Sequence, residues 1–136
     1  IKVNIIGQTK RLPKDIIKIV KKIEKKTLKN KQITLSLALN YGSKEEIVNA
    51  CRKLTLKKNK DININNLNEE LYTHNLPDPD VLIRTGGTKR LSNFLLWQLA
   101  YTEIFFIDKL WPDFNQNDFN KIVVQFDKIK RNFGKI

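Results

Sequence analysis

The residues best suited to chemistry lie in one stretch of the chain, residues 76–103. A short apolar strand is predicted at residues 81–83; it stops at Arg84, and the pair Gly86–Gly87 follows. A helix is predicted to open at Ser92, a residue type that is favoured at helix N-termini. A strand, a glycine-rich loop and a helix N-terminus are together typical of phosphate sites, because backbone N–H groups then point at the anion. This stretch therefore predicts a phosphate site.

Two arginines flank the glycine pair, and guanidinium groups match phosphate oxygens in pairs. Arg84 directly follows an apolar strand, where a charge without a partner is costly. It could clamp an anionic ligand, or it could form a structural pair with Asp78 or Asp80. Ser92 could serve only as a helix cap, but a cap needs nothing from Arg90. We therefore interpret Arg84, Arg90 and Ser92 as a diphosphate site.

Glu103 begins the next apolar stretch, residues 103–107. A carboxylate at such a place could bind Mg²⁺, which commonly takes one or two protein carboxylates together with phosphate oxygens. It could equally pair with Arg84, and the spacing leaves both interpretations open. His74 has no partner at ligand or triad spacing, and Cys51 is assigned to an apolar helix face. Neither the Walker pattern nor the Gly-x-Gly-x-x-Gly fingerprint occurs in the sequence.

The composition allows one packed domain, with 136 residues of which 40% are hydrophobic. The formal net charge of +12 favours nucleic acid, anionic membranes or phosphorylated ligands as partners. However, 21 of the 26 basic residues are lysine, a bias that an A/T-rich genome also produces. No apolar run approaches the length of a membrane span. The single cysteine excludes an internal disulfide and suits a reducing compartment.

The chain opens as a strand already in progress, without a start methionine or a signal-peptide pattern. We therefore expect it to be the C-terminal part of a longer protein.

Strands and helices are predicted to alternate along the sequence. This order favours an α/β fold, a parallel sheet with helices on both faces and ligands at the carboxyl ends of the strands. Strands are expected at residues 2–6, 33–39 (buried on both faces), 81–83 and 103–107. Helices are expected from Pro13 to about Leu28, at 94–100 and at 116–132. Another is expected to start at a capping box, Ser43–Glu46, and to bury Ile47, Val48, Cys51 and Leu54. A short helix near 67–72 is expected to follow a second capping box, Asn66–Glu69.

Several motifs closely resemble those of the cis-prenyltransferase family, which includes undecaprenyl diphosphate synthases. The resemblance covers essentially the whole chain. It is carried by Pro77–Gly87 and Arg90–Gln98, and further by Ile6–Gly7, Arg11–Pro13, Leu39–Gly42, Leu110–Phe114 and Arg131–Gly134.

The resemblance implies condensation of isopentenyl diphosphate with an allylic diphosphate such as farnesyl diphosphate, giving a cis-polyprenyl diphosphate. Arg84, Arg90 and Ser92 would hold isopentenyl diphosphate, and Glu103 would help bind Mg²⁺. The fold would be the family's parallel sheet, not the all-helical trans-prenyltransferase fold. The apolar strand at 33–39 would line a tunnel for the growing chain, with Ile33, Leu35 and Leu37 as candidates.

The resemblance further implies a homodimer. We also expect a location in the cytoplasm or an organelle stroma, peripheral membrane contact through the product, and no nucleic-acid partner.

The chain also departs from the family pattern. Ser43–Lys44 follow Gly42 where the family has Gly-Arg, and Thr88 stands where a glutamate is common. The catalytic aspartate of the family lies in a His-Met-Asp-Gly-Asn-Gly-Arg-Trp motif, which this sequence does not contain. We therefore expect residues 1–136 to be the C-terminal part of a single cis-prenyltransferase domain, with no catalytic residue and no activity alone.

Two alternatives remain. The chain could be a non-catalytic accessory subunit of a heteromeric cis-prenyltransferase, although an accessory chain need not keep the complete set of diphosphate and metal residues. It could also be a basic module that binds RNA or a membrane surface, which its net charge of +12 suggests.

Overall fold

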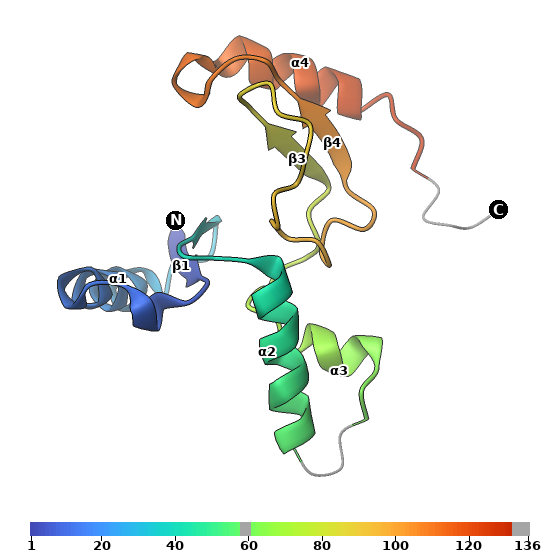
Figure 1. The fold of residues 1–136 in the computed structure, drawn as a ribbon. Coiled ribbons are helices and arrows are strands. Elements are labelled where there is room, and N and C mark those ends of the chain that lie inside the picture. Colours follow the sequence, from blue (N-terminus) through green and yellow to red (C-terminus); the bar gives the residue numbers. More distant parts are fainter. Residues whose placement is uncertain (58–60, 132–136) are drawn as a thin grey trace. The chain divides into compact units, whose positions relative to one another are not determined.

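The computed structural model describes residues 1–57 and 61–131 (Figure 1). The chain divides into two compact units, residues 1–77 and residues 78–136, and each is described by itself. Both contain a two-stranded parallel sheet, in the order β1-β2 and β3-β4. The predicted α/β class with parallel strands is therefore confirmed.

The first unit begins with a β-α-β arrangement. Strand β1 (Lys2–Ile6) pairs with β2 (Thr34–Ala38), and helix α1 (Lys14–Thr27) connects them (Figure 1). Side chains of α1 cover the other edge of β1, because Thr27 Oγ1 accepts the N–H of Val3 and Glu24 Oε1 accepts the N–H of Ile5, each at 3.0 Å. These bonds satisfy backbone donors that would otherwise invite another strand.

Strand β2 is not buried on both faces, as its apolar sequence suggested. Four of its five residues are exposed, among them Leu35 at 47% and Leu37 at 42%. The physical reason is topological, since within the described ranges β2 pairs with β1 alone and lies at an edge of its sheet.

Helix α2 (Ser43–Leu56) is present, but the predicted capping box is wrong. Gly42 is the N-cap. Ser43 is the first residue of the helix, and its side chain is fully buried. Glu46 faces inward instead of capping. The predicted inward position of Val48 is also wrong, because the buried face follows the helical spacing of Ser43, Glu46, Ala50 and Leu54 and leaves Val48 48% exposed.

Glu46 forms the centre of a small buried cluster. Glu46 is 2% exposed. Its carboxyl group accepts hydrogen bonds from the Tyr41 hydroxyl and, at 2.7 Å, from the Tyr72 N–H. The rings of Tyr41 and Tyr72 meet edge to face, with centroids 6.4 Å apart. One carboxylate thus joins the start of α2 to the segment that follows the next helix.

That next helix, α3 (Ile64–Asn68), begins earlier than predicted. The Asn63 side chain caps it by accepting the N–H of Asn66 at 2.9 Å, so the proposed box at Asn66–Glu69 does not form. Asn63 lies three residues before Asn66. Its backbone is extended, so its side-chain amide oxygen can accept from the free N–H groups of the first helical turn.

The second unit contains β3 (Val81–Arg84), β4 (Glu103–Phe106) and α4 (Gln116–Phe126) (Figure 1). Helix α4 starts with a complete capping box, in which Asn115 accepts the N–H of Asp118 and Asp118 accepts that of Asn115 at 3.1 Å. The hydrogen bond from Lys109, followed by that backbone bond, holds the pKa of Asp118 below its ordinary value. The helix ends at Phe126, short of the predicted Asn132, which lies outside the described residues.

The helix predicted at residues 94–100 is wrong: this segment forms turns instead. Ser92, Asn93 and Leu95 have φ angles of +49°, +62° and +44°. Such left-handed backbone cannot enter a right-handed helix, so no regular helix opens at Ser92.

No helix in residues 1–57 or 61–131 is both long enough and apolar enough to cross a membrane.

Gly7 closes the turn after β1 and cannot be replaced without strain. Its φ is +111°, and an added Cβ would lie 2.2 Å from the carbonyl oxygen of Leu39. We expect Gly7→Ala to lower the free energy of unfolding by at least about 2 kcal/mol, because the close backbone oxygen adds to the roughly 1–2 kcal/mol cost of left-handed backbone, a cost that Gly86 shares. Urea denaturation followed by circular dichroism measures the change. Gly86→Ala is the control, because Gly86 has φ +90° but no atom within 4 Å of an added Cβ. Equal losses in both variants would contradict the steric argument.

Candidate functional site

Arg84 is the last residue of β3, so its side chain leaves the sheet at the carboxyl end of the strand. It is half-buried, and its Nε donates to the carbonyl oxygen of Thr88 at 3.1 Å. Its terminal nitrogens form no hydrogen bond or ion pair within residues 1–57 and 61–131. Asp80 pairs with Arg131 instead of Arg84. Within the described residues, the structural pair of Arg84 with Asp78 or Asp80 is therefore not formed.

The glycine pair does not act as the predicted anion cradle. The N–H of Gly86 donates to the carbonyl oxygen of Lys109 at 2.8 Å, and that of Gly87 to Ile107 at 3.1 Å. The N–H of Ile107 in turn donates to the carbonyl oxygen of Arg84 at 2.8 Å. These bonds fix the loop against the segment after β4 and occupy both glycine donors. An anion bound at this loop would therefore have to contact groups other than these two amides.

Arg90 and Ser92 lie in the same segment, and both are exposed. Within the described parts of the chain, no hydrogen bond or ion pair engages either side chain. Ser92 opens the left-handed turn, and such backbone costs about 1–2 kcal/mol per non-glycine residue. Strain of this kind is frequent at ligand sites, where it aims a side chain. The turn thus takes the place of the expected helix N-terminus in presenting Ser92.

Glu103 stands apart from Arg84 along the sheet. It is the first residue of β4 and lies opposite Val81, whereas Arg84 lies opposite Phe106. At about 3.3 Å per residue, three steps separate the two backbone positions by roughly 10 Å along the strands. The structure therefore does not place Glu103 beside Arg84 as a direct ion-pair partner.

The described acidic, histidine and cysteine side chains do not cluster as metal ligands. Within residues 1–57 and 61–131, no group of three or more His, Cys, Asp or Glu side chains could hold a metal ion. Glu103 is a half-buried oxygen donor and fits Mg²⁺ in chemical type. As a single protein ligand it could hold Mg²⁺ only together with oxygens from a bound phosphate group.

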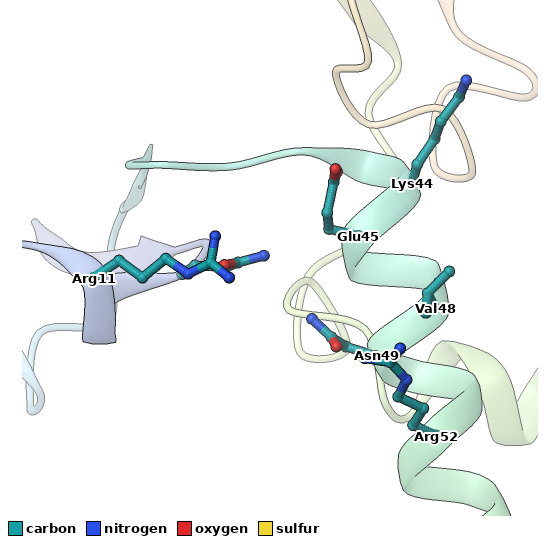
Figure 2. Close-up of a pocket in the computed structure, with 7 residues that line it drawn as sticks. Arg11, Lys44, Glu45, Val48, Asn49 and Arg52 are labelled. Atoms are coloured by element: carbon teal, nitrogen blue, oxygen red, sulfur yellow. The ribbon is translucent and has the colours of Figure 1, made fainter.

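Sequence reasoning missed a basic pocket in the first unit. It has a volume of about 360 Å³ and is lined by Gln8, Arg11, Lys44, Glu45, Val48, Asn49 and Arg52 (Figure 2). The available signal was the placement of arginine. Only five residues are arginine. Arg84, Arg90 and Arg131 lie in the second unit, and the other two both line this pocket.

The chain is similar to proteins of one family in both sequence and structure. Residues 1–134 match the family described as "Putative undecaprenyl diphosphate synthase". The chain is 42% identical over 135 residues to an isoprenyl transferase of Rickettsia typhi, covering 99% of the chain and 60% of that protein. It is 43% identical over 142 residues to an isoprenyl transferase of Prochlorococcus marinus, covering 100% of the chain and 52% of that protein.

Two solved structures have folds similar to that of this chain. One is lavandulyl diphosphate synthase from Lavandula x intermedia in complex with dimethylallyl diphosphate, with a TM-score of 0.93 and 35% identity over 98% of this chain and 60% of that one. The other is a probable undecaprenyl diphosphate synthase from Campylobacter jejuni, with a TM-score of 0.89 and 36% identity over 98% and 63% of the two chains. The chain thus spans between about half and three-fifths of the length of these two curated relatives.

Proposed function

Since the chain belongs to the undecaprenyl diphosphate synthase family, we propose that it supplies the isopentenyl diphosphate site of an isoprenyl transferase. The observation that carries the proposal is Arg84 at the carboxyl end of β3, held by Thr88 with its terminal nitrogens available. Arg90 and Ser92 follow in the same segment, and neither has a partner in residues 1–57 or 61–131. Guanidinium groups and a hydroxyl form a suitable donor set for a diphosphate.

The reaction we propose is condensation of isopentenyl diphosphate with an allylic diphosphate such as farnesyl diphosphate, repeated to build a cis-polyprenyl diphosphate. Arg84 and Arg90 orient the diphosphate and offset its charge, and Ser92 donates to one of its oxygens. Glu103 would hold Mg²⁺ together with phosphate oxygens. Bound Mg²⁺ would supply further neutralisation of diphosphate charge.

The exposed apolar face of β2 supports the proposed hydrocarbon tunnel. Leu35 and Leu37 of β2 are 47% and 42% exposed, and Ile33, which directly precedes the strand, is 61% exposed. Their alternation along the chain places them on one face. Covering a hydrocarbon chain with apolar surface of this kind is favourable, because it removes both from water. We further propose that the protein acts as a homodimer in the cytoplasm or an organelle stroma, with peripheral membrane contact through its product.

The catalytic aspartate motif of the family is not in this sequence, so we propose that residues 1–136 have no transferase activity alone. The test compares this chain with a chimera in which the part of the Rickettsia typhi isoprenyl transferase outside the match is fused to it, at the N-terminus where the catalytic motif is expected. Both receive labelled isopentenyl diphosphate, farnesyl diphosphate and Mg²⁺. We expect labelled polyprenyl product from the chimera and none from the chain. Turnover by the purified chain alone would refute the inactivity proposal.

A folded but silent chimera would favour the alternative of an accessory subunit. Circular dichroism and gel filtration establish folding before the assay, so that silence is interpretable. The product length from an active chimera would identify the subtype of synthase.

A further inference from the structure

The basic pocket of the first unit lies at the carboxyl ends of β1 and β2, the edge at which α/β sheets commonly bind ligands. Its lining comes from the segment after β1 and from α2. Figure 2 shows Arg11 reaching from that segment toward α2, where Asn49 lies on the facing side and Arg52 lies further along the helix. Two guanidinium groups from separate elements therefore line one cavity.

The segment that carries Arg11 is firmly held. The N–H of Gln8 donates to the carbonyl oxygen of Asn40 at 3.1 Å, and Asn40 Nδ2 donates back to the carbonyl oxygen of Gln8 at 3.3 Å. The N–H of Arg11 donates to the carbonyl oxygen of Gln8 at 3.2 Å. Asn40 itself has a φ of +46°, and Gly7 packs against the carbonyl oxygen of Leu39. The backbone beneath Arg11 is thus fixed before any ligand arrives, which reduces the ordering cost of binding.

The charges of this region are unbalanced. An overlapping pocket of about 560 Å³ shares Gln8, Arg11, Asn49 and Arg52, and adds Gly7, Thr9, Lys10, Lys53, Leu56 and Tyr72. Four of its lining residues are cationic and none is acidic, although Lys53 also pairs with Glu70. Within residues 1–57 and 61–131, neither Arg11 nor Arg52 has a side-chain hydrogen bond or ion pair. Glu45 is the one acidic residue in the lining of the smaller pocket.

We propose that this pocket is a second anion site, which binds a phosphate group between Arg11 and Arg52. Two guanidinium forks approaching from different elements suit a tetrahedral oxyanion, which offers oxygens in several directions. The side-chain amides of Gln8 and Asn49 add donors at the pocket wall. The ligand is a small phosphate-bearing anion, supplied either free in solution or as a lipid headgroup.

Nuclear magnetic resonance of the ¹⁵N-labelled 136-residue chain tests the proposal without any assay of catalysis. Inorganic phosphate and then inorganic diphosphate are titrated at low ionic strength. The readouts are the backbone amides of residues 8–11 and 49–53 and the Nε–H signals of the five arginines. We expect saturable shifts at Arg11 and Arg52, whatever happens at Arg84 and Arg90. Failure of the isopentenyl diphosphate proposal would leave these signals unaffected, so the two outcomes are distinguishable.

Variants separate a site from general positive charge. Arg11→Gln or Arg52→Gln should weaken binding about tenfold, the loss of one charge-assisted hydrogen bond. Lys22→Gln on the exposed surface of α1 removes the same charge outside the pocket and should change the affinity by less than about twofold. Equal weakening by Lys22→Gln, or shifts that never saturate, would overturn the proposal.

Vesicle flotation identifies the source of the phosphate. If the source is a lipid headgroup, the chain floats with phosphatidic acid vesicles but not with phosphatidylcholine vesicles, and Arg11→Gln/Arg52→Gln does not float. If the source is a free anion, the resonance shifts occur without pocket-dependent flotation. Flotation that the double variant retains would exclude the headgroup at this pocket.

Discussion

Replacing Arg90 with alanine should raise the Michaelis constant for isopentenyl diphosphate by roughly 10- to 100-fold, since a charge-assisted hydrogen bond contributes about 1.5–3 kcal/mol. Arg90 is exposed and forms no hydrogen bond or ion pair with residues 1–57 or 61–131, so we expect its loss to leave the fold intact and to act only through the proposed ligand contacts. Steady-state kinetics of the active chimera, with isopentenyl diphosphate varied at saturating farnesyl diphosphate, measures the effect.

Lys89→Ala is the matched control for Arg90→Ala. Lys89 is the adjacent residue, it is also exposed, and it carries the same charge. We expect it to change the Michaelis constant by less than about threefold, the scale of exposed charge interactions. Similar effects from both substitutions would show that the segment attracts the substrate only through its total charge, and the assignment of Arg90 would fail.

Arg84 should respond differently from Arg90. Arg84→Ala also removes the Nε hydrogen bond to Thr88, so it should loosen the loop as well as weaken substrate binding. Arg84→Lys keeps the charge but cannot reproduce the planar fork, and we expect it to recover only part of the affinity. Full recovery by lysine would contradict the expectation that the planar guanidinium group binds Thr88 and the substrate at the same time.

The largest expected effect on stability is at Glu46. Glu46→Ala should lower the free energy of unfolding by about 3 kcal/mol, because it removes two hydrogen bonds to a buried carboxyl group and leaves the Tyr72 N–H without its partner. Urea denaturation followed by circular dichroism measures the total. Hydrogen exchange at the Tyr72 amide gives a local readout, and we expect its protection to fall.

Neighbouring substitutions test whether the buried cluster is the cause. Tyr41→Phe removes only the hydroxyl donor and should cost about 1 kcal/mol, since the bond to the Tyr72 amide remains. Glu45→Ala removes an exposed carboxylate from the same turn and should cost less than about 1 kcal/mol, the upper limit for exposed charge interactions. A loss at Glu45 as large as that at Glu46 would mean that charge in the first turn, not burial, stabilises α2.

The features that the sequence predicted well are local ones. Strands β1 and β3 lie within a residue of their predicted bounds, because runs such as Val81–Ile83 are apolar and β-branched. The position of Arg84 at a strand end follows from the same local signal. The helix predicted at residues 94–100 failed because apolar spacing carries no information about the left-handed angles at Ser92, Asn93 and Leu95.

The features that the sequence missed depend on distant parts of the chain. The separation of Glu103 from Arg84 follows from the register of β3 and β4, which neither strand specifies alone. The pocket between Arg11 and Arg52 requires the turn after β1 to meet α2, and those segments are far apart in the sequence. The role of Glu46 depends on Tyr72, 26 residues away.

The exposed apolar strand β2 has a consequence for how this polypeptide behaves in solution. Leu35 and Leu37 lie on an edge strand, the kind of surface through which sheets associate into aggregates. The net charge of +12 opposes that association by mutual repulsion between molecules. Salt shortens the range of this repulsion, to about 10 Å at 0.1 M ionic strength. Added salt should therefore turn clear solutions of this chain turbid, whereas dilute buffer should keep them dispersed.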